Sequence, residues 1–220
     1  MPKISILIAT RDRAHLIGRA IESVLKQTFT DWEIIVADDA STDNTREIID
    51  KLAMTNSKIK YLNSNTNVGI ARISNKALRE AKGEYIAILD DDDYWSDSDK
   101  LKKQVEFLEK NQEYIGVGGG VIVVDKNNKE LFRYLKPETD DQIRKKMLFD
   151  NPMANSTTLF RRSAAEKVGL YDEGLRYSAD RDFWLKMGLI GKLYNLPEHF
   201  TYYLMAGQNT RIFSMTPRSE

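Results

Sequence analysis

Short apolar runs alternate with amphipathic segments along the first ninety residues. The runs are rich in β-branched and aliphatic residues, and they occupy positions 4–9, 32–37, 59–62 and 84–89. They are continuously apolar rather than alternating, which is typical of strands buried on both faces of a parallel sheet. At least three of the four runs fit that description.

An amphipathic helix is predicted after each of the first three runs. The first has one apolar stripe at a period of 3.6 residues, made by Leu16, Ile17, Ala20, Ile21, Val24 and Leu25. The second carries Ile48, Ile49, Leu52 and Ala53 after a cap at Ser41 or Asp43. The third is expected from about 70 to 81, closed by Gly83. This order predicts right-handed βαβ units in a three-layer α/β/α fold with a mostly parallel central sheet.

The second half is less regular. Helices are predicted at 101–111, at 164–168 and from Asp182 onward, and strands at 116–124, 156–160 and 200–204 after a turn at Pro197. The tail, residues 207–220, has no periodicity and is expected to be mobile or truncated. We therefore predict a single domain over residues 1–206, with a nucleotide-binding half to about 95 and an acceptor-side half from 96 to 206.

Composition narrows the function classes and the compartment. The 220 residues contain 33 basic and 33 acidic side chains, so no overall charge attracts nucleic acid or an acidic membrane. There are no cysteines, which excludes disulfides, thiolate metal sites and a cysteine nucleophile. No apolar run approaches the roughly 20 residues that span a bilayer, and the start is too short for a secretory signal. We expect a cytoplasmic protein.

Polar side chains collect where the predicted parallel strands end. The first strand leads to Thr10, Arg11, Asp12 and Arg13, the second to Asp38 and Asp39, and the fourth to Asp90, Asp91, Asp92 and Asp93. Ligands of open α/β sheets bind beyond the carboxyl ends of such strands. Two arginines beside several carboxylates suit a nucleotide diphosphate with Mg²⁺ or Mn²⁺.

The run of four aspartates is the sharpest of these signals. Four consecutive carboxylates on a tight turn repel one another unless a cation lies among them. A solvated acidic loop is the alternative interpretation. The position directly after a buried strand, with Tyr94 and Trp95 following, favours a metal site.

The other candidates each have an ordinary structural alternative. The pair Asp38 and Asp39 could serve helix capping, yet capping does not require two carboxylates, and one of them could accept a hydrogen bond from a nucleobase. Arg72 could face the same rim or be a surface arginine. Asp180 opens a predicted helix, where an acidic residue favours the macrodipole, or it could remove the proton of an acceptor hydroxyl.

Taken together, these segments resemble family-2 glycosyltransferases, which are inverting enzymes with the GT-A fold. The matching motifs occur in the family's order and spacing at residues 5–13, 38–43, 67–72, 89–95, 168–172 and 180–185. The resemblance reaches from the N-terminus to about Leu204, and the motifs are specific as a set.

The resemblance implies a role for each matching residue. Thr10 and Arg11, with Arg13, would line the nucleotide pocket, Asp39 would bind the base, commonly uracil, and Arg72 would border the nucleoside. Asp90, Asp91 and Asp92 match the DxD motif, with Asp92 as the ligand of Mn²⁺ or Mg²⁺ and the first two near ribose. Asp180 matches the catalytic base, and the segment 155–158 usually faces donor sugar or acceptor. The implied partners are a UDP-linked nucleotide-diphospho-sugar and a glycan or lipid-linked acceptor, with peripheral membrane association at the inner face.

Two positions depart from the family pattern. Ala179 stands where a glutamate often precedes the base, and Tyr203 to Ala206 replace a Tyr-Arg-x-His stretch. The processive synthase motif Gln-x-x-Arg-Trp is missing, which favours addition of single sugars. The alternatives are a nucleotide-sugar-binding protein with weakened catalysis, and a sugar-phosphate nucleotidyltransferase, disfavoured because no Gly-rich basic loop follows the first strand.

Overall fold

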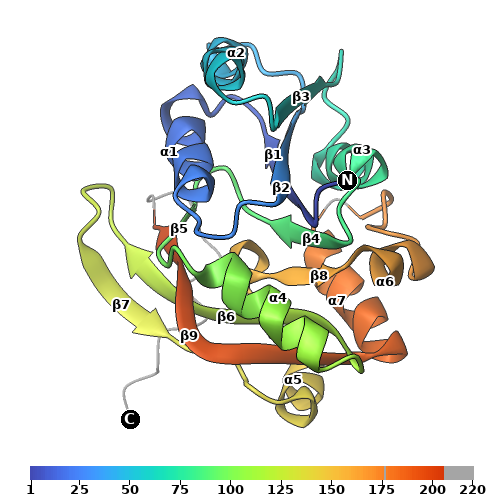
Figure 1. The fold of residues 1–220 in the computed structure, drawn as a ribbon. Helices are drawn as coiled ribbons and strands as arrows, with labels where there is room; N and C mark the ends of the chain where they lie inside the picture. The colour runs from blue at the N-terminus through green and yellow to red at the C-terminus, as the bar shows by residue number, and fades with distance from the viewer. Residues whose placement is uncertain (176, 206–220) are drawn as a thin grey trace.

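The computed structural model describes residues 1–175 and 177–205, and the 207–220 tail lies outside them. The described residues form one nine-stranded sheet with helices on both faces (Figure 1). The strand order is β3-β2-β1-β4-β8-β6-β9-β5, and β7 pairs with β6 beside this path. No helix of the described ranges combines the length and the apolar character needed to cross a bilayer.

The strands are β1 (Ile4–Thr10), β2 (Trp32–Asp38), β3 (Ile59–Asn63), β4 (Tyr85–Ile88), β5 (Tyr94–Trp95), β6 (Tyr114–Val124), β7 (Glu130–Tyr134), β8 (Leu159–Arg161) and β9 (Lys192–Leu204). The helices are α1 (Ala14–Leu25), α2 (Thr45–Thr55), α3 (Ile70–Glu80), α4 (Lys100–Lys110), α5 (Asp140–Met147), α6 (Arg162–Lys167) and α7 (Ala179–Ile190), with a short 3₁₀ turn at Asn155–Thr157.

The first half follows the predicted βαβ pattern. Strand β1 pairs in parallel with β2 and β4, and β2 pairs in parallel with β3. All residues of β2 and β4 are buried, and β1 is nearly so, because helices cover both faces of these strands. β3 lies at the edge of the sheet and is only partly buried.

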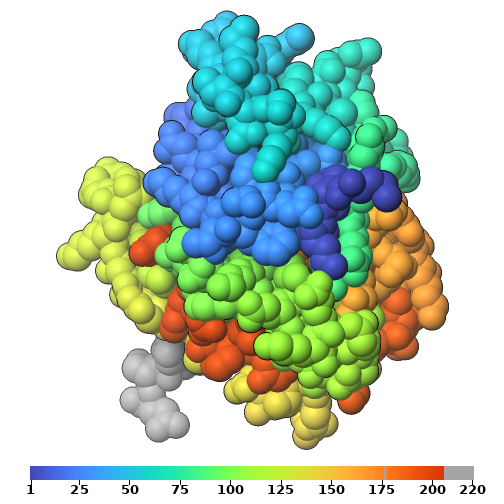
Figure 2. All heavy atoms as spheres, in the orientation of Figure 1, coloured from blue at the N-terminus to red at the C-terminus, as the bar shows by residue number. Residues whose placement is uncertain are grey.

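Two apolar clusters, one on each face of the sheet, produce three layers. One cluster joins alternate residues of β1, such as Ile6 and Ile8, to α1, α2 and α4. The other joins Leu7 and the opposite face of β2 to α3, α5, α6 and α7. The period of two along β1 therefore sends successive side chains into different cores. In Figure 2 the early residues (blue to cyan) form the upper part of the visible face and α4 (green) covers the sheet below them.

Beyond β4 the sheet becomes mixed. Strand β8 runs antiparallel to both β4 and β6, whereas β6 and β9 are parallel. The expectation of a mostly parallel sheet thus describes β3-β2-β1-β4, and in the other half antiparallel pairs flank the parallel pair β6 and β9. The short β8 is what reverses the direction.

The predicted turn at Pro197 is wrong, because β9 continues through this residue. The register with β6 shifts from Gly118↔Asn195 to Gly120↔His199, so extra residues bulge out opposite Gly119. Proline lacks an N–H donor and is tolerated at such a bulge. A Cβ on Gly119 would lie 2.4 Å from the Phe200 ring, so the bulge also explains this glycine.

The elements β5, β7 and α5 were not predicted from the sequence, and the strand expected at 156–160 is a 3₁₀ turn, Asn155–Thr157, followed by β8. Strand β5 is only two residues long, and β7 is an edge strand whose side chains are largely exposed. α5 is short and mostly polar, with a capping box between Thr139 and Gln142 that was not recognised.

Gly83 carries the largest predicted effect on stability. A Cβ at this position, in the connection between α3 and β4, would lie 2.4 Å from the backbone nitrogen of Ser5, so this connection and β1 could not approach as they do. We expect Gly83→Ala to lower the free energy of unfolding by about 2–3 kcal/mol, measured by urea denaturation. Gly18→Ala is the control, because its Cβ would meet Ile48 at 4.0 Å and a helical alanine stabilises by about 0.5–1 kcal/mol. Equal stabilities for the two variants would contradict this prediction.

Candidate functional site

The carboxyl ends of β1 and β2 lie side by side at one rim of the sheet. Thr10 is the register partner of Asp38, and the Asp39 backbone nitrogen donates to the Thr10 carbonyl at 2.9 Å. Thr10 and Asp39 are both buried, whereas Arg11 beside them is exposed. The structure therefore brings together the first group of residues that the sequence singled out.

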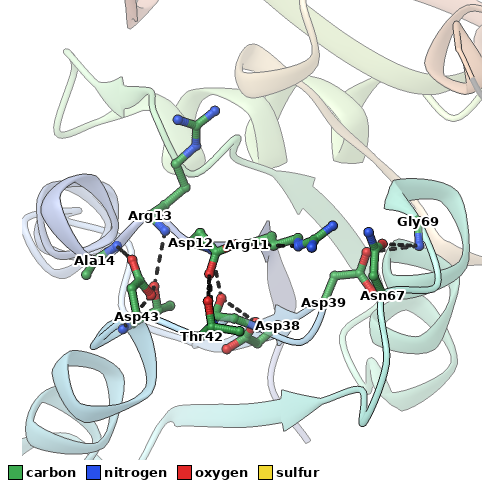
Figure 3. A network of polar contacts seen from close by, with 12 residues as sticks. Arg11, Asp12, Arg13, Ala14, Asp38, Asp39, Thr42, Asp43, Asn67 and Gly69 are labelled. Carbon is green, nitrogen blue, oxygen red and sulfur yellow. Dashed lines mark hydrogen bonds and ion pairs between the residues drawn. The ribbon is translucent and has the colours of Figure 1, made fainter.

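Asp12 joins the loop after β1 to the loop after β2 (Figure 3). Its carboxylate accepts from the Thr42 backbone nitrogen at 2.7 Å, and its own nitrogen donates to the Ser41 hydroxyl at 2.9 Å. Asp12 has a positive φ of 51°, a conformation that these two bonds hold in place. These hydrogen bonds thus hold the loop after β1 and the loop after β2 together beneath the carboxyl ends of the two strands.

Asp43 serves two helices at once, which differs from the predicted capping. One oxygen accepts from the Thr45 nitrogen at the start of α2, and the other accepts from the Ala14 nitrogen at the start of α1. Ser41 caps no helix, because its hydroxyl bonds to Asp38 at 2.6 Å instead. The tertiary contact between the two helix starts decides this arrangement.

The two carboxylates at the end of β2 have different surroundings. Asp38 accepts from the backbone and hydroxyl of Ser41 and from the Tyr61 hydroxyl, which gives it a structural role. Asp39 accepts one backbone N–H on each oxygen, from Val68 at 2.7 Å and from Gly69 at 2.9 Å. Each Asp39 oxygen keeps a lone pair that can accept a further donor.

The three candidate arginines differ in direction. Arg11 extends toward Asp39, whereas Arg13 points away from it (Figure 3). Arg72, on the first turn of α3, is exposed and lies 3.8 Å from Glu173, a residue of the loop before α7. Arg11 forms an ion pair with Asp12, whose carboxylate lies 3.6 Å from its Nε. Arg13 lies at the start of α1, and Arg72 borders the rim from α3.

The aspartate turn after β4 is tied to the 155–158 segment. Asn155 donates to the Asp90 carboxylate at 3.1 Å, and the Ser156 hydroxyl donates to Asp93 at 2.5 Å while accepting from the Asp90 nitrogen. Arg19 of α1 donates to the Asp92 carbonyl at 3.2 Å. These bonds hold the turn from both sides, so its carboxylates stay close together.

Burial and mutual repulsion raise the pKa values of this turn. Burial, with Asp92 nearby, raises the pKa of Asp90 to about 7. Burial also raises the pKa of Asp91 to about 6, against the opposing effect of Arg13. The pKa of Asp93 is raised well above its usual value by burial and by Asp90. Among the described residues, the turn thus places the carboxylates of Asp90, Asp91, Asp92 and Asp93 close together, and Arg13 is the cationic side chain that opposes their repulsion at Asp91.

This donor set fits a divalent cation that completes its coordination from elsewhere. Oxygen ligands suit Mg²⁺ and Mn²⁺, and a positive charge would relieve the repulsion around Asp92. Within residues 1–175 and 177–205, no three acidic or imidazole side chains converge on one point. A cation held by one or two carboxylates takes its other ligands from phosphate oxygens and water.

A cavity of about 250 Å³ opens beside the aspartate turn. Its floor is apolar, formed by side chains of β1, α3 and β4, and its polar groups include Asp90, Asn155 and Asp180. Tyr171 also lines it, and burial raises the pKa of its hydroxyl, with Asp90 and Asp180 adding to the effect. Residues almost a hundred positions apart in sequence therefore face one space.

Asp180 stands on the first turn of α7, which begins at Ala179 directly after Ser178, a residue with a positive φ of 60°. Its Oδ2 accepts from the Asn151 side-chain amide at 2.9 Å. No local pattern in the sequence pointed to Asn151 or Arg19, since neither belongs to a periodic stripe or a charged run. An asparagine before Pro152, in a segment without regular structure, was the only available hint.

The match to a family model covers residues 5–169, three quarters of the chain, and its description is glycosyl transferase family 2. The chain belongs to glycosyl transferase family 2. It is therefore a glycosyltransferase, as the resemblance predicted.

Two relatives of the chain are also named as glycosyltransferases. The chain is 35% identical over 201 residues to the putative glycosyltransferase EpsE of Bacillus subtilis, covering 90% of this chain and 71% of that protein. It is 37% identical over 135 residues to WfgD of Escherichia coli, a UDP-Glc:alpha-D-GlcNAc-diphosphoundecaprenol beta-1,3-glucosyltransferase, covering 61% of this chain and 51% of WfgD.

Solved structures confirm the GT-A fold. S. aureus TarS 1-349 in complex with UDP superposes with a TM-score of 0.73 at 23% identity, covering 93% of this chain and 61% of that one. A mannosyltransferase of Pyrobaculum calidifontis in complex with GDP-Man and Mn²⁺ gives 0.72 at 19% identity, covering 96% and 59%. The chain spans about half to seven tenths of the length of these relatives.

Proposed function

We propose that this protein is an inverting, metal-dependent, non-processive glycosyltransferase. It transfers one sugar from a UDP-linked donor to the hydroxyl of a lipid-linked or glycan acceptor. In this proposal Asp39 binds the nucleobase and Asp92 holds Mn²⁺ or Mg²⁺. Asp180 is the catalytic base that removes the proton of the acceptor. The other residues that contact the nucleotide are Thr10, Arg11, Arg13, Arg72, Asp90 and Asp91.

One observation carries this proposal: Asp90 and Asp180 line the same cavity. Asp90 belongs to the aspartate turn that follows β4, and Asp180 to the start of α7. The charge of Asp180 contributes to the raised pKa of Asp90, after burial and Asp92, which supports their proximity. A donor held at the turn would therefore present its anomeric carbon to the side where Asp180 stands.

The chemistry follows from these positions. Asp180 takes the proton of the acceptor hydroxyl while that oxygen forms its bond to the anomeric carbon. The bond from this carbon to the diphosphate oxygen breaks in the same step, so the configuration inverts and nucleoside diphosphate leaves. When bound, a divalent cation would neutralise the negative charge that develops on the leaving diphosphate. Arg11 and Arg13 add positive charge at the rim.

The acceptor and the location rest on the relatives. WfgD and a Campylobacter jejuni glucosyltransferase act on undecaprenol-linked diphosphates, as their names state. By analogy, we assign this chain to the cytoplasm at the inner face of a membrane. We also assign nucleotide binding to residues up to about 95 and acceptor binding to residues 96–206.

The test is calorimetric titration with UDP and GDP, each with Mn²⁺ and with EDTA. We expect UDP to bind at least about tenfold more tightly in Mn²⁺ than in EDTA, and more tightly than GDP, because Asp92 would hold the cation and the cation would neutralise the charge of the diphosphate. Release of nucleoside diphosphate with an inverted product would then identify transfer. Binding without release would favour a nucleotide-sugar-binding protein, and release of pyrophosphate would favour a nucleotidyltransferase.

A further inference from the structure

The side chain that contacts Asp180 comes from a segment to which nothing so far assigns a role. Asn151 lies four residues after the end of α5, and its Nδ2 donates to Asp180 Oδ2 at 2.9 Å. We propose that Asn151 is a positioning residue, which holds the Asp180 carboxylate in the orientation needed for proton removal. This inference rests on the proposed role of Asp180 as the base.

The orientation of the Asn151 amide is determined by its other end. Its Oδ1 accepts from the Met153 backbone nitrogen at 3.2 Å, so the oxygen is turned away from Asp180 and the NH₂ group toward it. Its carbonyl oxygen accepts from Lys136 Nζ at 2.9 Å, which holds the backbone in place. A carboxylate and an amide oxygen would repel each other, so the NH₂ group is the end of Asn151 that can contact Asp180.

The segment that carries Asn151 is anchored from two further elements. Arg181 of α7 donates to the carbonyls of Met147 and Leu148, at 3.2 and 3.0 Å. Asn195 of β9 is buried, and it donates to the Pro152 carbonyl at 3.1 Å. Asn151 is therefore held on both sides along the chain, which is a requirement for a group that must fix another side chain within a fraction of an ångström.

The contact has a direct consequence for the base. With Oδ2 bound to Asn151, Oδ1 is the oxygen left to accept the proton of an acceptor hydroxyl. Lys136 adds positive charge to the same neighbourhood: burial lowers its pKa, while Asp150 and Asp180 oppose that effect. Asp180 thus has one oriented oxygen and a cationic group nearby, although Ala179 supplies no second carboxylate.

A purely structural tether would also produce this hydrogen bond, so the test must separate the two roles. We would measure UDP release from UDP-glucose, UDP-galactose and UDP-N-acetylglucosamine with water as acceptor, for Asn151→Ala and Asn151→Asp. The readouts are kcat, KM for the donor, the dissociation constant for UDP with Mn²⁺, and the thermal midpoint. Gln112→Glu, the same amide-to-carboxylate change on the exposed α4–β6 connection, is the control for Asn151→Asp.

For a positioning residue we expect kcat to fall about 10- to 100-fold while KM and UDP affinity change less than about twofold. Asn151→Asp should fall further than Asn151→Ala, because it places a like charge against Asp180. Loss of donor affinity in parallel with kcat, or an unchanged kcat, overturns the proposal. If Asn151→Ala unfolds, the isosteric Asn151→Asp decides alone.

A double variant keeps this inference distinguishable from the proposed function. If Asn151 acts through Asp180, adding Asn151→Ala to Asp180→Asn should lower kcat no further. A further drop shows an independent role for Asn151 and overturns the inference while Asp180 stands. An unchanged kcat in Asp180→Asn alone overturns the base itself.

Discussion

Replacing Asp180 by asparagine is expected to lower the rate of sugar transfer by about 10²–10⁴-fold, because the acceptor hydroxyl loses the group that removes its proton. Asparagine is isosteric, and its oxygen still accepts from Asn151, so the start of α7 keeps its contact. Donor binding should be unchanged, since the aspartate turn and the Asp39 pocket are untouched. The measurements are the transfer rate and calorimetric titration with UDP and Mn²⁺.

The control for this substitution is Asp182→Asn on the same helical turn. Asp182 forms an ion pair with Lys186 at 2.9 Å and does not line the cavity. Its removal should leave the transfer rate within about twofold of the original, since this ion pair is partly exposed and such pairs contribute little. Equal losses in the two variants would mean that negative charge at the helix start, not a base, explains the effect.

Replacing Asp92 by alanine is expected to remove most of the metal dependence of donor binding. Asp92 carries the charge that, after burial, most raises the pKa of Asp90, so it lies where a cation would be most favourable. We expect affinity for UDP in Mn²⁺ to fall at least about tenfold, toward the value in EDTA, and transfer to fall about 10²–10³-fold. Titrations of UDP at several Mn²⁺ concentrations measure this directly.

Asp31→Ala is the matched control, because Asp31 is an exposed aspartate at the opposite rim, just before β2. It changes the net charge by the same amount without touching the turn. An Asp92→Ala protein with its original Mn²⁺ dependence would move the cation to another carboxylate of the turn, and Asp90→Ala and Asp91→Ala would then be compared in the same titration.

The first half of the fold could be predicted from the sequence, because each of its strands and helices has its own local pattern of apolar residues. Continuous apolar runs predicted β1, β2 and β4, and stripes of period 3.6 predicted α1, α2 and α3, since both faces of these strands are covered by their own crossover helices. Strands β7 and β5 were not predicted, because an edge strand and a two-residue strand bury too few apolar side chains to produce a hydrophobic pattern in the sequence. Pro197 was misjudged because a bulge against Gly119, formed with a distant strand, lets the proline remain in β9.

For the site, sequence alone determined the chemistry at the strand ends: arginines after β1, carboxylates after β2 and β4, and an aspartate at a helix start. These followed from chain order, because parallel strands deliver their carboxyl ends to one rim. Only the tertiary structure decided which side chains meet. In the folded chain Asp38 accepts hydrogen bonds from Ser41 and Tyr61, and Asp43 accepts from the first turns of two helices. Asp90 and Asp180 line one cavity, and Asn151 donates to Asp180. Such contacts join segments tens of residues apart, and a hydrogen bond depends on distance and angle in space, which no local pattern of hydrophobic and polar residues records.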